Sequence, residues 1–305
     1  MDHKSVLLTE LIELLEVKPH GVYVDLTLGR GGHSKLLLEN LNSDGTLIVF
    51  DKDIVAINEV KVAKTLNQDN VIFIHQDFRH LKMTLEELGY QEVDGIIADL
   101  GMSSPQVDDP SRGFSYQEDG PLDMRMNQND RVTAREIVNT YSYQQLVRVF
   151  YEYGDEKYAP QIAKRLILAR DIHPITTTFE LVTIVKNALP MKELAKKGHP
   201  AKKVFQALRI EVNDELNALR EMLSDATKLL KRNGRLLVIT FQEDEDRIVK
   251  QFFNSLAKVK QNRYDPHTIV PEFKLLLRHA LTPSEAEVSQ NHRSKSAHLR
   301  GIIKK

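Results

Sequence analysis

The sequence predicts an α/β protein whose doubly wound, mostly parallel sheet is interrupted after its fourth strand by a helical insertion. Four short apolar runs alternate with helical segments in the N-terminal third of the chain. A further strand-like run, Arg235–Phe241, comes much later, and the residues before it are helical and rich in Tyr, Gln, Lys and Arg. Alternation of strands and helices is typical of a parallel sheet with helices on both faces.

The four N-terminal runs are expected to be buried parallel strands. Each consists of β-branched and other apolar residues and ends in an acidic residue or a turn, as expected where helices cover both faces of a sheet. The runs are Val22–Asp25, Leu47–Asp51, Val71–Ile74 and Gly95–Asp99. Two late runs, 273–278 and 296–303, are predicted to complete the sheet.

Helices are predicted before the first strand, between the strands and at the end of the insertion. Thr9 is the expected cap of the first helix, and segments 33–41 and 54–66 are the helices between strands. The apolar residues of 205–230 recur every three or four positions, which predicts one long helix. Asn233-Gly234 is the stop signal expected just past its last turn.

Residues 1–107 and 213–305 are therefore expected to form the sheet domain, and residues 108–212 the helical insertion. The chain has 305 residues, of which 41% are hydrophobic and 28% charged, as in globular proteins of one large domain or two smaller ones. Its formal net charge of −1 argues against a general binder of polyanions.

The composition also excludes several classes of protein. The absence of Cys excludes a disulfide framework, thiolate metal sites and a Cys nucleophile, and no cluster has metal-ligand spacing. No apolar run approaches the roughly 20 residues of a membrane-spanning helix. The segment Met1–Lys4 lacks the pattern of a signal peptide, so a cytoplasmic location without membrane attachment is expected.

A glycine-rich turn follows the first predicted strand, in the segment Asp25–Ser34. Glycines at such a turn let a ligand approach the backbone and expose free amides at the start of a helix. Asp51, at the end of the second strand, is placed to accept hydrogen bonds from a ribose. The two features together indicate a cofactor that contains adenosine, although the glycines alone could simply form a tight turn.

The ends of the third and fourth strands add further candidates. Asp77 could bind the amino group of an adenine and Phe78 could stack on its ring, although core packing is the ordinary role of a single Phe. The loop Asp99–Gln106 should line the reaction centre, because ligands of open α/β sheets lie beyond the carboxyl ends of the strands. Ser34 stands where a dinucleotide fingerprint requires Gly, which disfavours a nucleotide-dependent oxidoreductase.

A series of motifs along the chain closely resembles the RsmH (MraW) family of bacterial ribosomal RNA methyltransferases, from His3 to about Arg300. In order, the motifs are Thr27–His33, Asp99–Gln106, Arg112–Ser115, Leu122–Met126, Gly198–Ala201, Phe205–Ile210 and Asn213–Leu216. The resemblance implies a class I S-adenosylmethionine (SAM) methyltransferase sheet with an insertion that recognises the substrate. It also implies transfer of a methyl group from SAM to the exocyclic N4 of a cytidine in the decoding region of 16S rRNA.

The same resemblance implies which residues bind SAM: Gly31, Gly32, His33, Asp51, Phe78, Asp99 and Gln106. One segment departs from the family pattern. Where the family usually reads Thr-Phe-His-Ser-Leu-Glu-Asp-Arg, this chain has Gln242, Glu243 and Asp244 in place of the His, the Ser and the Leu. That departure leaves a second interpretation open, in which the protein is a catalytically weakened SAM-binding factor for ribosome assembly.

No residue is identified as the catalytic base, and Asp99 is the best candidate. Cytosine N4 is a poor nucleophile, so positioning and hydrogen bonds that localise its lone pair should supply the catalysis. Asp99 or backbone carbonyls of its loop could accept the amino hydrogens, but Asp99 could equally be a pure cofactor ligand. The absence of Cys fits amino methylation, because carbon-5 methylation of pyrimidines uses a thiolate.

Three basic tracts predict a surface that follows the phosphates of 16S rRNA in the small ribosomal subunit. Residues 157–170 carry a local charge of +4, residues 191–209 carry 6 − 1 = +5, and residues 291–305 carry +5. Each tract alone could be an ordinary solvated face. The target cytidine is expected to be flipped out or unpaired, and a homodimer is an option that the sequence leaves open.

Overall fold

The computed structural model describes residues 5–258, 260–262 and 265–305. Met1–Lys4 lie outside the described residues. They are the segment that lacks a signal-peptide pattern, and they include His3, where the family resemblance begins. The chain divides into two compact units. The sheet unit comprises Met1–Gly101 and Leu216–Lys305, and the insertion unit comprises Met102–Glu215. These limits lie a few residues from 107 and 213, because the strand that enters the insertion ends at Asp99 and the helix that leaves it bends at Asp214.

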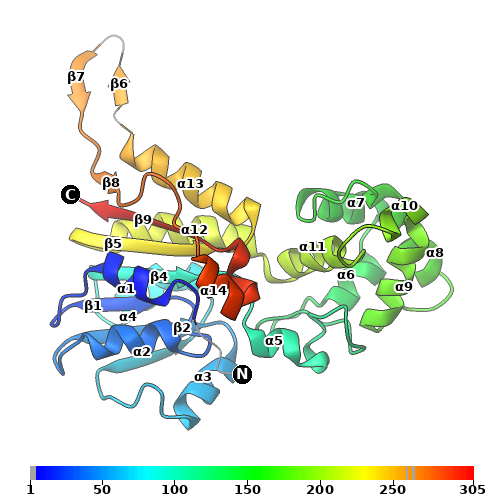
Figure 1. Cartoon of the computed structure of the whole chain (residues 1–305), viewed down its shortest axis with the longest axis horizontal. Helices are drawn as coiled ribbons and strands as arrows, with labels where there is room; N and C mark the ends of the chain where they lie inside the picture. The colour runs from blue at the N-terminus through cyan, green and yellow to red at the C-terminus, as the bar shows by residue number, and fades with distance from the viewer. Residues whose placement is uncertain (1–4, 259, 263–264) are drawn as a thin grey trace. The chain divides into compact units, whose positions relative to one another are not determined.

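The sheet unit contains a seven-stranded sheet in the order β3-β2-β1-β4-β5-β9-β8 (Figure 1). Strands β1 to β5 are parallel, whereas β9 runs antiparallel to both β5 and β8. This topology confirms the predicted doubly wound α/β fold. The strands of the sheet are β1 Val22–Asp25, β2 Thr46–Asp51, β3 Val71–His75, β4 Val93–Asp99, β5 Leu230–Thr240, β8 Phe273–Leu275 and β9 His298–Lys304. A separate two-stranded sheet pairs β6 Lys260–Asn262 with β7 Asp265–Ile269.

Helices cover both faces of the large sheet, so the sheet unit has three layers (Figure 1). One face, with Val24, Ile48 and Ile96, packs on helices α4 Leu81–Glu87, α12 Glu215–Leu229 and α13 Glu243–Ala257. The other face packs on helices α1 Leu8–Leu15, α2 Gly32–Glu39 and α3 Ile54–Val62. Because both faces are buried, the strands are continuous apolar runs, as the sequence predicted.

The order of the strands places three acidic residues at one edge of the sheet. Asp25, Asp51 and Asp99 are the last residues of β1, β2 and β4, which are neighbours in the sheet and run in the same direction. The chain crosses from β3 back over β1 to β4, so the direction of winding reverses between β1 and β4. Open α/β sheets bind their ligands in the crevice at this reversal.

The expected role of Thr9 as a helix cap is wrong. Helix α1 begins at Leu8, and its N-cap position is Leu7, which has a left-handed backbone (φ 51°) and no side-chain cap. The Leu7 N–H instead donates a hydrogen bond of 2.9 Å to Oε1 of Glu287, which lies on helix α14 Glu285–Gln290. A long-range carboxylate therefore does the capping that was expected from a local side chain.

The single helix predicted over 205–230 is also wrong, because the structure contains two. Helix α11 Lys202–Asn213 ends at Asp214, whose left-handed backbone (φ 49°) stops the helical hydrogen-bond pattern, and α12 starts at Glu215. Asn233-Gly234 does not follow the end of a helix either. It lies inside β5, where Asn233 has φ 64° and the register with β4 shifts between Val93 and Gly95, as at a β-bulge.

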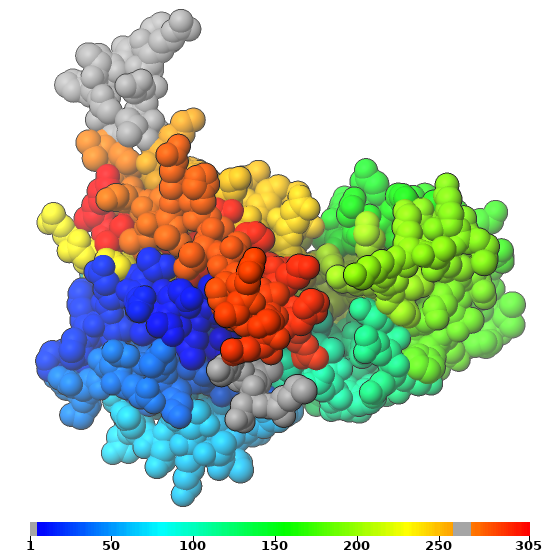
Figure 2. All heavy atoms as spheres, viewed as in Figure 1, coloured from blue at the N-terminus to red at the C-terminus, as the bar shows by residue number. Residues whose placement is uncertain are grey.

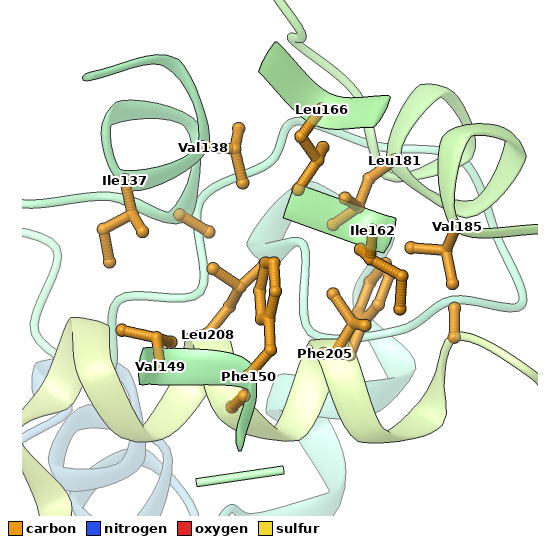
Figure 3. Packing of buried hydrophobic residues seen from close by; sticks show 14 of the residues in the cluster. Ile137, Val138, Val149, Phe150, Ile162, Leu166, Leu181, Val185, Phe205 and Leu208 are labelled. Atoms are coloured by element: carbon orange, nitrogen blue, oxygen red, sulfur yellow. The ribbon is translucent and has the colours of Figure 1, made fainter. Parts of the chain in front are cut away.

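The insertion unit is an assembly of helices around its own apolar core. Helices α6 to α9 and α11 all contribute buried side chains, and the residues labelled in Figure 3 point toward one another from these helices. Phe150, on α7, is fully buried at the centre of this packing. The helices of the unit are α5 Ser104–Asp108, α6 Ala134–Thr140, α7 Tyr143–Glu152, α8 Ala159–Arg170, α9 Thr178–Ala188, α10 Met191–Leu194 and α11 Lys202–Asn213, with a 3-10 turn at Pro110–Arg112.

Two polar contacts hold the end of α11 in the insertion unit. Arg209 forms a bidentate ion pair with Glu215, with both N–O distances 2.8 Å and exposures of only 8% and 12%. The side chain of Asn213 accepts a hydrogen bond from the Met126 N–H and donates one to the Met124 carbonyl, both of 2.8 Å. The bend at Asp214 is thus held by side chains on either side of it.

We expect Arg209→Ala to lower the free energy of unfolding by about 3–5 kcal/mol, because it leaves the Glu215 carboxylate buried without its cation. Urea unfolding followed by circular dichroism measures this loss. The control is Arg148→Ala, which removes a half-exposed partner of Glu211 and should cost about 1 kcal/mol or less. Equal losses in the two variants would contradict the assignment.

Candidate functional site

The glycine turn after β1 is held by the acid at the end of β2. The Gly29 N–H donates a hydrogen bond of 2.8 Å to Asp51 Oδ2, and the Asp53 N–H donates one of 2.8 Å to Asp51 Oδ1. Gly29 and Gly31 have left-handed backbones (φ 50° and 75°), which other residues adopt only under strain. Glycine adopts this backbone without strain at both positions; Gly29 is partly exposed and Gly31 is buried.

Burial raises the pKa of Asp51 to about 7, although two backbone N–H groups lower it in part. Each carboxylate oxygen accepts one backbone hydrogen bond and keeps a lone-pair direction for another donor. A pair of neighbouring hydroxyl groups, as on a ribose, could supply such donors. The structure therefore places Asp51 where the sequence expected it, with acceptor capacity to spare.

Asp25 is the most deeply buried of the three acids, with 2% exposure. Its Oδ1 accepts a hydrogen bond of 3.0 Å from the Thr27 N–H, and its Oδ2 accepts one of 2.6 Å from Ser34 Oγ. Desolvation raises its pKa, against the lowering effect of these hydrogen bonds. The Ser34 side chain thus connects helix α2 to the end of β1. In the sequence, Ser34 was noted only as a departure from a dinucleotide fingerprint.

Asp99 differs from the other two acids because part of its carboxylate has no partner. Its Oδ1 is buried and makes no hydrogen bond within the described part of the chain. Its backbone N–H donates to Thr27 Oγ1 at 2.6 Å, which ties the end of β4 to the turn after β1. Burial raises the pKa of Asp99 to about 6, with His33 opposing and Asp25 reinforcing the shift. An unpaired buried acceptor of this kind is costly unless a ligand satisfies it.

His33 lies between the N-terminal segment and Asp99. Its Nε2 is 3.0 Å from the carbonyl oxygen of Val6, and its Nδ1 is 3.7 Å from Asp99 Oδ2. Only 5% of His33 is exposed. A side chain on the neighbouring Gly32 would collide with the side chain of Ser5, so the segment before α1 packs directly on the start of α2.

The third strand leads to a short 3-10 helix, Phe78–His80, that begins with the predicted aromatic residue. Asp77 caps this helix by accepting a hydrogen bond of 3.0 Å from the Arg79 N–H, and its Oδ2 is 3.0 Å from Lys52 Nζ. Phe78 is partly buried and packs against the core under α4, α12 and α13. The structure thus shows Phe78 packed on the core. Stacking of its exposed part on an adenine ring stays a prediction.

Gln106 belongs to the insertion unit, unlike the other predicted site residues. It lies on α5 and is 6% exposed. Its Oε1 accepts a hydrogen bond of 3.0 Å from the Ser103 N–H, as in a capping box. The structure therefore brings Gly31, Gly32, His33, Asp51 and Asp99 together at one edge of the sheet unit, and it describes Gln106 in a separate unit.

Some residues around the site could not be found from local patterns. Ser5 packs on Gly32 and the Val6 carbonyl contacts His33, while Glu287 caps helix α1 at Leu7. The segment that departs from the family pattern forms the start of α13, directly after β5. Its Gln242 has a buried Oε1 without a hydrogen bond in the described residues. The sequence signal for this residue was the departure from the family pattern. The structure adds that its segment follows β5, the neighbour of β4 in the sheet.

Residues 5–258, 260–262 and 265–305 hold neither a metal-binding cluster nor a membrane-spanning helix. Nowhere in those ranges do three His, Asp or Glu side chains gather in a group that could hold a metal ion. No helix among the same residues has the length and apolarity to cross a membrane.

The geometry suits a ligand that carries both hydroxyl donors and a positive charge. Asp51 offers acceptors to hydroxyl groups, and Asp99 offers an unpaired buried oxygen beside the glycine turn. A cation beside Asp99 would favour its ionised form and offset the cost of burying it. Such a site binds and orients a charged small molecule, and no described residue in it is arranged as a nucleophile with its base.

The comparisons with known proteins identify the family of the chain. A family model described as the MraW methylase family matches residues 1–305. A relative from Streptococcus mutans, named Ribosomal RNA small subunit methyltransferase H, is 49% identical over 307 residues, which cover 99% of this chain and 97% of the relative.

Two solved structures resemble the chain at low identity. A putative rRNA-methylase from Clostridium thermocellum is 13% identical with a TM-score of 0.47, covering 99% of this chain and 100% of that one. An rRNA methylase from Streptococcus thermophilus is 11% identical with a TM-score of 0.45, covering 100% of this chain and 98% of that one. The match of the family model along the whole sequence shows that this chain belongs to the MraW methylase family, which confirms the identification made from its motifs.

Proposed function

We propose that the protein transfers a methyl group from SAM to the exocyclic N4 of a cytidine in the decoding region of 16S rRNA. The observation that carries the proposal is the group of acids at the ends of β1, β2 and β4, which are buried or partly buried beside the glycine turn. Membership of a methylase family and a relative named as a small-subunit rRNA methyltransferase support the reaction and the substrate.

The residues present fit SAM. Asp51 would accept hydrogen bonds from the two ribose hydroxyls, and Asp99 Oδ1 would accept one from the ammonium group of the methionine part. The Gly31 and Gly32 backbones would lie along the ligand, with His33 holding Asp99 in place. Phe78 would lie on the adenine, and Gln106 stays a proposed cofactor ligand on the basis of the family motifs.

When bound, SAM supplies an electrophilic methyl group on a positively charged sulfur. This chain's residues would bind and orient the two reactants and exclude water, because the site offers no nucleophile of its own and the chain lacks Cys. The ionised Asp25, Asp51 and Asp99 would also attract a cationic ligand. Asp99 acts here as a cofactor ligand, which leaves the amino group of the base to be held by other residues.

The alternative of a weakened assembly factor is not favoured. The departure from the family pattern, at Gln242, Glu243 and Asp244, lies after β5, and it leaves the acids and the glycine turn unchanged. Glu245 still caps the start of α13 by accepting hydrogen bonds from the Phe241 and Gln242 N–H groups. Nothing in this segment removes a group on which methyl transfer by orientation depends.

The insertion unit is proposed to bind the RNA, and the structure sorts its cations into paired and unpaired ones. Lys157 and Lys196 both pair with Glu193, and Lys203 pairs with Asp155. Arg209 is buried in its pair with Glu215, so it does not contribute to a phosphate-binding surface. Within the tracts 157–170 and 191–209, the exposed cations without an ion pair among the described residues are Lys164, Arg165, Lys192, Lys197 and Lys202.

The third basic tract, 291–305, is largely used within the sheet unit. Arg300 forms a bidentate pair with Asp246, at 2.7 and 2.8 Å. Lys304 donates to the Leu230 carbonyl at 2.6 Å. Arg300 and Lys304 are therefore engaged within the sheet unit, and the insertion unit is proposed as the main RNA surface.

The function is tested by mass spectrometry of rRNA nucleosides after purified protein and SAM are incubated with small subunits from cells that lack it. We expect N4-methylcytidine to appear in a decoding-region fragment of 16S rRNA. Its appearance elsewhere in the RNA would contradict the proposed target, and the absence of any methylated nucleoside would contradict the activity.

Asp99→Asn should weaken SAM binding by about 10- to 100-fold, because it removes a charge-assisted hydrogen bond worth about 1.5–3 kcal/mol. Isothermal titration calorimetry measures this. The control is Asp94→Asn at the opposite end of the same strand, where the carboxylate pairs with Lys18 and Lys231. That variant should lose stability and keep its SAM affinity, and a matching loss of affinity would refute the role of Asp99.

The affinity of the wild-type protein for SAM should rise with pH between about pH 5 and about pH 8. The pKa values of Asp99 and Asp51 are raised to about 6 and about 7, so these carboxyls are protonated at low pH and lose the charge that attracts the ligand. Calorimetry at several pH values measures the slope. In Asp99→Asn the lower part of this rise should disappear, whereas a flat profile in the wild type would argue against carboxylate recognition.

Lys202→Gln should weaken binding to 16S rRNA fragments and reduce the slope of log affinity against log salt by about 0.7–0.9, the value expected for one lost phosphate contact. Lys203→Gln is the matched control, because Lys203 already pairs with Asp155. We expect a smaller change for this neighbour. Filter binding at several salt concentrations makes the comparison, and equal slopes for Lys202→Gln and the wild type would exclude a phosphate contact at this lysine.

A further inference from the structure

Two buried side-chain oxygens have no hydrogen-bond partner among the residues that the structure describes: Asp99 Oδ1 and Gln242 Oε1. Leaving a buried acceptor unpaired costs about 1–3 kcal/mol, so each such atom calls for an explanation. The proposed function assigns the Asp99 oxygen to the cofactor. The oxygen of Gln242 has no assignment.

The two oxygens belong to neighbouring strands at the same edge of the sheet. Asp99 ends β4 and is in register with Ile239 of β5, and the Leu100 N–H donates a hydrogen bond of 2.9 Å to the Ile239 carbonyl. Further along, a Cβ on Gly101 would lie 3.8 Å from the ring of Phe241. The segments 99–101 and 239–241 therefore run side by side. Gln242 is the next residue of the chain, at the carboxyl end of the strands, where open α/β sheets bind their ligands.

The backbone of Gln242 is held firmly. Glu245, which is 3% exposed, accepts hydrogen bonds from the Phe241 N–H at 3.0 Å and from the Gln242 N–H at 3.2 Å through the same oxygen, Oε2. Asp246, one residue further, is anchored by Arg300 of β9. At the N-cap of α13 the Gln242 side chain is directed toward the backbone of Glu245, as in a capping box, but its oxygen makes no hydrogen bond there within normal distance and angle limits.

We propose that Gln242 Oε1 contacts the substrate by accepting a hydrogen bond from the exocyclic amino group of the target cytosine. This inference rests on the proposed function. An unpaired acceptor is complementary to a donor, and the cytosine amino group carries two N–H bonds at the atom that is methylated. A uracil presents a carbonyl oxygen at the same position, so the Gln242 oxygen would also favour cytosine over uracil.

The role of the side chain is to orient the amino group. In the reaction, the N4 lone pair forms the bond to the methyl carbon, the carbon–sulfur bond breaks with its electron pair remaining on sulfur, and N4 then releases one proton to solvent. A neutral amide accepts a hydrogen bond without taking up a proton. The N–H that faces Gln242 would therefore be the one retained, and holding it turns the lone pair toward the incoming methyl group.

The test compares Gln242→Ser, Gln242→Glu and the control Glu243→Gln in the full-length protein, with SAM and undermethylated small subunits. Ser keeps a good N-cap but is too short to reach a substrate. Glu keeps the length and an acceptor oxygen. Glu243 is the exposed neighbour on the same turn of α13. The kcat and KM for subunits, the Kd for SAM and the Tm are measured for each protein.

We expect Gln242→Ser to lower kcat by about 10- to 100-fold, with the Tm near that of the wild type and the Kd for SAM within about twofold. Gln242→Glu should recover activity as pH rises and its new carboxyl ionises, a pH dependence that a purely structural role would not produce. Wild-type kcat in Gln242→Ser, or a flat low profile in Gln242→Glu, would overturn the inference. Failure of the wild-type protein itself to methylate would instead overturn the proposed function.

Discussion

The proposed site depends on the burial of carboxylates at the carboxyl edge of the parallel sheet. Three acids end adjacent strands, and the low polarity around them raises their pKa values. Such groups destabilise the protein by themselves, and hydrogen bonds from the glycine turn and from Ser34 offset part of that cost. The remaining acceptor capacity is what makes this edge a binding site for a cationic ligand with hydroxyl groups.

The support of this edge comes from both ends of the chain. Glu287 near the C-terminus caps helix α1 through Leu7, the Val6 carbonyl contacts His33, and His33 lies beside Asp99. Figure 2 shows the orange to red C-terminal segments lying over the blue N-terminal part of the sheet unit. A change far from the strands can therefore move the carboxylate that we propose binds the cofactor.

The insertion unit shows how little a local charge count says about binding. Its tract 191–209 carries a local charge of +5, yet Lys203 and Arg209 are neutralised by acids outside the tract, Asp155 and Glu215, and Lys196 pairs with Glu193 inside it. Arg209 has a structural role, because it holds the end of α11 beside the bend at Asp214. The other cations of the tract, Lys192, Lys197 and Lys202, form no ion pair among the described residues.

The sequence by itself determined the order and the type of the strands, the insertion after β4 and the acids and glycines at the strand ends. These features are local: side-chain patterns of a few residues decide them, and parallel topology then brings the strand ends together. Sequence patterns also identified the family, because the family motifs occur in the same order along nearly the whole chain. Periodicity failed at Asp214, where a left-handed residue divides a regular apolar pattern into two helices.

Only the tertiary structure decided which polar atoms are satisfied. Leu7 is capped by a residue 280 positions away, and Lys203 is paired across 48 positions, so no local pattern could report either contact. The same holds for the two unpaired oxygens of Asp99 and Gln242, because a missing partner is a property of the whole surrounding fold. Hydrogen bonds and ion pairs are short-ranged in space and join residues distant in sequence, and for that reason the strand pattern could be predicted while the chemistry of its edge could not.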